Sequence, residues 1–147
     1  MQQRCCLIVV EDEALLRLVI EMTLREDTDL DFRVLSTVGA ALEVLEAEAE
    51  RLDFLVTNID LGDVELTGFD LARRARELNP DIFVVYISGA SGHLFETEKV
   101  PGAIFLPKPF EADRLLAVLR NRCAEENPPE PPQAMDDTSR PPGPGTP

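Results

Sequence analysis

Five short apolar runs alternate with amphipathic stretches over the first 126 residues, and this alternation constrains the fold more than any other feature. The runs are rich in Val, Ile and Phe and lack helical periodicity, which is typical of strands covered on both faces. We expect strands at Cys5–Val10, Phe32–Ser36, Phe54–Asn58, Ile82–Ser88 and Ala103–Leu106.

The intervening stretches space their apolar residues three and four apart, as expected of helices that bury one face. In the first stretch this stripe consists of Leu16, Val19, Ile20 and Leu24. Residues 90–99 form the weakest predicted helix, because Gly89 and Gly92 interrupt the pattern. The other helices are expected at Glu13–Arg25, Ala40–Arg51, Phe69–Leu78 and Ala112–Cys123. The alternation predicts an α/β fold, a doubly wound (βα)5 five-stranded parallel sheet with right-handed crossovers.

The composition changes after residue 126. Eight of the twelve prolines lie in residues 127–147, where large apolar residues are scarce. Such a segment buries too little apolar surface to offset the entropy lost on ordering. We therefore expect one domain over residues 1–126 and a disordered, Pro-rich tail over residues 127–147. The chain is then either a single-domain protein or a fragment of a longer one.

The chain has a net charge of −14, of which −12 belongs to the expected domain, since only three of the 28 acidic residues and one of the 14 basic residues lie beyond residue 126. Nucleic-acid affinity comes largely from Lys and Arg that neutralise phosphates, so direct nucleic-acid binding is not expected. The apolar run Cys5–Val10 is too short to span a membrane, which favours a cytoplasmic protein. Cys5, Cys6 and Cys123 are odd in number and lack C-x-x-C spacing, so neither a disulfide framework nor a zinc site is expected. His93, the single histidine, is a poor candidate for a ligand.

Polar residues stand at the ends of four expected strands. In a parallel sheet these ends meet at one edge, where ligands of doubly wound folds bind. Carboxylates and a backbone carbonyl suit Mg²⁺, whereas a hydroxyl and an ammonium suit phosphoryl oxygens. The residues concerned are Glu11 and Asp12, Asn58 and Asp60, Ser88, and Lys108.

Residues 4–124 resemble the receiver domains of bacterial two-component response regulators, through E-D-E at 11–13, L-V-T-N-I-D-L at 55–61, S-G at 88–89 and K-P-F at 108–110. The resemblance implies a flavodoxin-like fold and a role in phosphorelay signal transduction, with a cognate histidine kinase or phosphotransfer protein as partner. It implies a signalling domain rather than an enzyme, with no catalytic residue of its own.

The same resemblance implies roles for individual residues. Mg²⁺ would be held by Glu11, Asp12, Asn58 and Asp60, the last through its backbone carbonyl. Ser88 would be the switch hydroxyl, Phe105 the rotating aromatic side chain, and Lys108 the phosphate-binding cation, aimed by a cis Lys108–Pro109 bond.

Two registers compete for the phosphoacceptor aspartate of the family. Counting D-x-x-x-x-D from Asp53 places Asn58 there, whereas counting back from Gly68 favours Asp60. We prefer Asn58, because the core sets the strand length and the loop over residues 62–67 absorbs extra residues at little cost. An amide has no anionic oxygen to attack phosphorus, and the loss of one negative charge predicts weak Mg²⁺ binding.

Three hypotheses follow. The chain is a natural pseudo-receiver that binds a downstream protein through the face of residues 90–110, or a receiver whose aspartate was replaced by engineering. Both hypotheses leave open whether the chain forms a homodimer through the face of the fourth helix. The third hypothesis is a flavodoxin-like nucleotide- or flavin-binding enzyme. That enzyme needs a Gly-rich loop after the first strand, where this chain has E-D-E, so we disfavour it.

Overall fold

A five-stranded parallel sheet forms the centre of the protein. The structure is a computed structural model that describes residues 4–63, 65–89 and 92–126. The strand order is β2-β1-β3-β4-β5, with β1 between β2 and β3, so the sheet is doubly wound as predicted. The strands are β1 (Cys5–Val10), β2 (Leu30–Leu35), β3 (Phe54–Asn58), β4 (Phe83–Ser88) and β5 (Ile104–Pro107).

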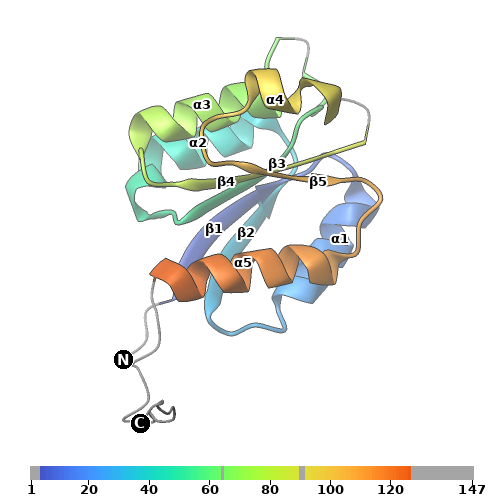
Figure 1. Cartoon of the computed structure of the whole chain (residues 1–147), viewed down its shortest axis with the longest axis vertical. Helices are drawn as coiled ribbons and strands as arrows, with labels where there is room; N and C mark the ends of the chain where they lie inside the picture. Colours follow the sequence, from blue (N-terminus) through green and yellow to red (C-terminus); the bar gives the residue numbers. More distant parts are fainter. Residues whose placement is uncertain (1–3, 64, 90–91, 127–147) are drawn as a thin grey trace, which may run out of the picture.

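Helices cover both faces of this sheet (Figure 1). One face carries α1 (Ala14–Leu24) and α5 (Ala112–Glu126), and the other carries α2 (Val38–Glu48), α3 (Gly68–Leu78) and the short α4 (Phe95–Glu98). Single 3-10 turns, η1 (Ala49–Arg51) and η2 (Gly92–Leu94), follow α2 and precede α4. The weak helix expected over residues 90–99 is therefore only η2 and α4, and its residues 90–91 lie outside the described part of the chain.

Alternate residues of each strand enter two separate apolar layers. In β1, Leu7 and Val9 pack in the layer beneath α1 and α5, whereas Ile8 and Val10 pack in the layer beneath α2 and α3. Because both sheet faces are covered, β3 and β4 are buried along their whole length. This explains why their sequences are continuous apolar runs rather than alternating ones.

The largest error in the predicted strands concerns β2. We expected it to begin at Phe32, but it begins at Leu30, because Leu30 pairs with Cys5 at the start of β1. Similarly, α2 begins before the predicted Ala40, at Val38, where the Thr37 side chain caps the helix by accepting a hydrogen bond from the backbone of Ala40.

The expectation of no disulfide was wrong, because a disulfide joins Cys5 to Cys123. The start of β1 and the last turns of α5 lie together, with 6.3 Å between the two Cα atoms, although 118 residues separate them in sequence. An odd number of cysteines and the absence of a spacing motif do not report on such proximity in space. Cys6, the next residue of β1, is the free cysteine.

Two further expectations concern membrane spans and the domain boundary. Among the described helices, none combines the length and apolar character needed to cross a membrane. The Pro-rich tail, residues 127–147, lies outside the described residues, so the boundary at residue 126 stays a prediction.

The start of α3 lies directly against the end of β3. Thr67 and Asp70 form a capping box at the start of this helix, and the Gly68 N–H donates to the Ile59 carbonyl at 2.8 Å. A Cβ on Gly68 would lie 2.2 Å from the backbone oxygen of Asn58. Glycine is thus required here because two backbones touch at the last residue of β3.

We predict that Gly68→Ala lowers the free energy of unfolding by about 2 kcal/mol, because the added methyl group must push β3 and α3 apart. Gly39→Ala is the matched control. Gly39 lies in α2 with no atom within 4 Å of an added Cβ, so this change should raise stability by up to about 1 kcal/mol. Urea unfolding measures both variants, and equal stability of the two would contradict the close packing at Gly68.

Candidate functional site

The carboxyl ends of four strands meet at one edge of the sheet and bring the predicted polar residues together. Glu11 and Asp12 follow β1, Asn58 ends β3, Ser88 ends β4, and Lys108 follows β5. The structure buries Glu11, Asn58 and Ser88, whereas Asp12 and Asp60 are exposed. The edge therefore has a dry inner part, which contains Glu11, and an outer part open to water.

Glu11 is a fully buried carboxylate, and each of its two oxygens has a polar neighbour. The Nζ atom of Lys108 lies 3.0 Å from its Oε1, and the Glu13 backbone N–H donates to its Oε2 at 2.9 Å. Burial raises the pKa of the Glu11 carboxyl above its ordinary value, while the Glu13 N–H and the Lys108 ammonium act in the opposite direction. Glu11 is thus held in place by the Lys108 ammonium and by the backbone N–H of Glu13, which immediately precedes α1.

The Asn58 side chain lies between the two carboxylates of the β1–α1 loop. Its Nδ2 donates to the backbone oxygen of Asp60 at 2.8 Å and to Asp12 Oδ1 at 3.0 Å, and a longer contact of 3.4 Å reaches Glu11 Oε2. The Thr57 hydroxyl donates to the Asn58 carbonyl at 2.9 Å. The amide of Asn58 therefore links β3, the β1–α1 loop and the loop that follows β3.

Asp60 reaches this site through its backbone. Because β3 ends at Asn58, Asp60 lies beyond the hydrogen-bonded strand and presents its carbonyl oxygen to the Asn58 amide. Its side chain is exposed. Asp53, which precedes β3, accepts a hydrogen bond on its side chain from the Cys6 backbone at 2.8 Å.

Ser88 and Lys108 are neighbours through the β4–β5 pairing. The Lys108 backbone N–H donates to the Ser88 carbonyl at 2.9 Å, and the expected cis bond joins Lys108 to Pro109. Phe105 is partly buried, and the centroid of its ring lies 5.3 Å from the ring centroid of Phe95 in α4. Phe95 in turn contacts Tyr86, so an aromatic row connects β4, α4 and β5.

Sequence reasoning missed one residue that shapes the site. The Arg17 guanidinium donates to the backbone carbonyls of Glu11 and Asp12, at 3.0 and 2.9 Å, and so fixes the loop that carries both acids. An arginine in the first turns of a helix that follows an acidic loop was the available signal.

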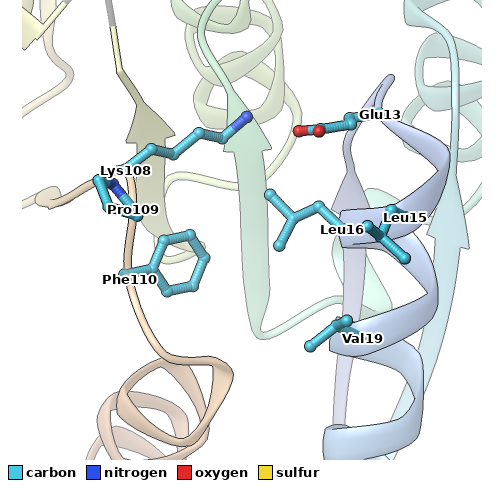
Figure 2. Close-up of a pocket in the computed structure, with 7 residues that line it drawn as sticks. All are labelled: Glu13, Leu15, Leu16, Val19, Lys108, Pro109 and Phe110. Atoms are coloured by element: carbon cyan, nitrogen blue, oxygen red, sulfur yellow. The ribbon is translucent and has the colours of Figure 1, made fainter.

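The outer face of α1 is the second feature that the sequence did not reveal. We expected Val19 in the buried stripe, yet Leu15, Leu18, Val19 and Met22 are between 41% and 69% exposed. Two of these four, Leu15 and Val19, line a groove of about 540 Å³ between α1 and the β5–α5 loop, together with Leu16, Pro109 and Phe110. Figure 2 shows Phe110 facing Leu16 and Val19 across the groove, with Lys108 and Glu13 extending toward one another at its upper end.

A five-stranded parallel sheet of order 2-1-3-4-5, with acids after β1 and a lysine after β5, defines the flavodoxin-like receiver class. Comparison with known proteins agrees with this class. Residues 7–120 match the model of the response regulator receiver domain family, and the chain belongs to this family.

Similar proteins share sequence and structure over most of their length. The chemotaxis protein CheY of Listeria monocytogenes is 28% identical over 115 residues, which cover 77% of this chain and 93% of that protein. A response regulator receiver protein from Sinorhizobium medicae is 31% identical, with a TM-score of 0.74 over 82% of this chain and 94% of that one. The receiver domain of NtrX from Brucella abortus is 26% identical, with a TM-score of 0.68 over 81% and 98%.

We predict that Lys108→Met lowers the free energy of unfolding by about 2 kcal/mol, because it leaves the buried Glu11 carboxylate without its countercharge. The control is Lys99→Met. Lys99 pairs with the exposed Glu96, so its loss should cost less than about 1 kcal/mol. Chemical denaturation compares the two variants, and a smaller effect at Lys108 than at Lys99 would refute the assigned pairing.

Proposed function

We propose that this receiver domain carries Asn58 at the phosphoacceptor position and acts through protein contact without being phosphorylated. The observation that supports the proposal is the position of the Asn58 side chain, which ends β3 and contacts both Asp12 and the Asp60 backbone. The family places its acceptor aspartate at this strand end. An amide has no anionic oxygen and forms no acyl phosphate, so transfer from a histidine kinase or phosphotransfer protein would stop here.

Around Asn58 the other proposed roles are retained. Ser88 would supply the switch hydroxyl, Phe105 the rotating aromatic side chain and Lys108 the phosphate-binding cation. Receiver domains in general bind Mg²⁺ at their acidic pocket. Here Glu11, Asp12 and the Asp60 carbonyl would offer oxygen donors with one carboxylate fewer, and we propose weak affinity.

Protein contact is supported by exposed apolar side chains. In the described part of the proposed face, residues 92–110, Leu94 is exposed and Phe95 and Phe105 are partly so. The outer face of α1, formed by Leu15, Leu18, Val19 and Met22, is the larger such surface, and its spacing of three and four residues suits a partner that presents an amphipathic helix. We propose a cytoplasmic signalling protein whose partners are a kinase or phosphotransfer protein and a downstream protein.

Intact-mass spectrometry after incubation with acetyl phosphate and Mg²⁺ tests the proposal. We expect no mass gain for the unmodified chain and a gain of one phosphoryl group for Asn58→Asp, because that change supplies the missing nucleophile. Asp60→Asn in the Asn58→Asp background should keep the labelling. A phosphoryl group on the unmodified chain would overturn the proposal and point to Asp60 as acceptor in the shifted register.

Labelling of Asn58→Asp would show that Glu11, Asp12 and Lys108 form a competent site once the nucleophile is present. If neither chain is labelled, the assignment of position 58 to the acceptor role is wrong.

A further inference from the structure

The Asn58 amide nitrogen is surrounded by three oxygen atoms from three residues. They are the Asp60 backbone oxygen at 2.8 Å, Asp12 Oδ1 at 3.0 Å and Glu11 Oε2 at 3.4 Å. Two carboxylate oxygens and a carbonyl oxygen are donors of the kind that a hard divalent cation takes. In this structure they instead converge on an N–H donor, which has two protons for three acceptors.

These residues do not fit a divalent cation as they are arranged. An amide nitrogen donates hydrogen bonds and does not serve as a ligand to Mg²⁺, which needs oxygen donors at about 2.0–2.1 Å. To admit a cation, the Asn58 side chain must turn its carbonyl oxygen inward and break all three contacts together. Among the described residues, no three His, Cys, Asp or Glu side chains form a group able to hold a metal ion.

The charges of the site also indicate that the Asn58 amide supplies attraction that a cation would otherwise supply. Two carboxylates, Glu11 and Asp12, lie here with the Lys108 ammonium 3.0 Å from Glu11. The partly positive N–H₂ group of Asn58 supplies the remaining attraction that keeps Asp12 and the Asp60 carbonyl drawn inward. An aspartate at position 58 would instead bring a third negative group to the same distance, and like charges so close disfavour one another unless a cation lies between them.

We propose that the Asn58 side-chain amide takes the place of the divalent cation between Glu11, Asp12 and the Asp60 backbone, so that the pocket is assembled without metal. The inference rests on the proposed function in treating position 58 as the acceptor site. It adds that Asn58 is a positioning residue: it closes the pocket and obstructs metal entry. Weak Mg²⁺ binding then results from competition with the amide as well as from the lost charge.

Mn²⁺ binding followed by electron paramagnetic resonance separates an obstructing amide from a liganding one. In Asn58→Ala a possible oxygen ligand is lost together with the amide protons. If the amide obstructs the cation, Asn58→Ala binds Mn²⁺ more tightly than the unmodified chain, on the order of tenfold in Kd. If the amide oxygen is a ligand, the same variant binds more weakly, and the proposal is overturned.

Thermal unfolding in EDTA and in Mg²⁺, at matched ionic strength, gives a second readout. The unmodified chain should unfold at nearly the same temperature in both buffers, because it binds Mg²⁺ only weakly. Asn58→Asp should unfold at a lower temperature in EDTA and recover on the order of 5 °C in saturating Mg²⁺, since the cation binds the folded state. A Mg²⁺-dependent rise in the unfolding temperature of the unmodified chain equal to that of Asn58→Asp would also overturn the proposal.

Asn79→Asp is the matched control for the second readout. The Asn79 amide donates to the backbone oxygens of Ala49 and Leu52, at 2.9 and 3.0 Å, far from the acids of the β1–α1 loop. This variant should lose stability in both buffers and recover nothing with Mg²⁺. The two proposals fail in different ways. Phosphoryl labelling of the unmodified chain overturns the proposed function. The role of the amide is decided instead by Mn²⁺ affinity and by the effect of Mg²⁺ on the unfolding temperature.

Discussion

The in-register pairing of β1, β3, β4 and β5 is the constraint on which the rest of the site depends. Val10 pairs with Thr57, Asn58 with Ile87, and Ser88 with Pro107. The residue after each strand therefore arrives at the same edge as its neighbours, without a long loop to position it. The hydrogen bond from the Gly68 N–H to the Ile59 carbonyl holds α3 against this edge, and the absence of a side chain at Gly68 permits the close approach, so strand length and helix start are determined together.

Burial of the Glu11 carboxylate is the largest electrostatic cost at this edge of the sheet. A carboxylate taken out of water is stable only with charge and hydrogen-bond partners. Lys108, the Glu13 N–H and the Asn58 amide provide them, while Arg17 holds the backbone that carries the acid. On the proposed function, an asparagine in the position of a nucleophile is then a coherent part of the charge balance rather than a decayed residue.

Much of the architecture could be predicted from the pattern of residues. The bounds of β1 and β3 were predicted to the residue, because each is a continuous apolar run that both sheet faces bury. The start of β2 could not be, since it depends on pairing with Cys5 and its exposed residues dilute the apolar signal. The disulfide of Cys5 with Cys123 and the exposure of Val19 both depend on how α1 and α5 pack, which local periodicity does not encode.

The sequence by itself determined the receiver fold and the set of polar groups at the strand ends, because periodicity and strand order require no knowledge of distances. It also placed an amide among them at position 58. Only the tertiary structure decided what that amide contacts. Hydrogen bonds of 2.8–3.4 Å from Asn58 to three residues, two of them 46 and 47 positions away, arise from the folding of β1 beside β3. The sequence states which chemical group stands at each position, whereas the fold decides which other groups come within hydrogen-bond distance of it.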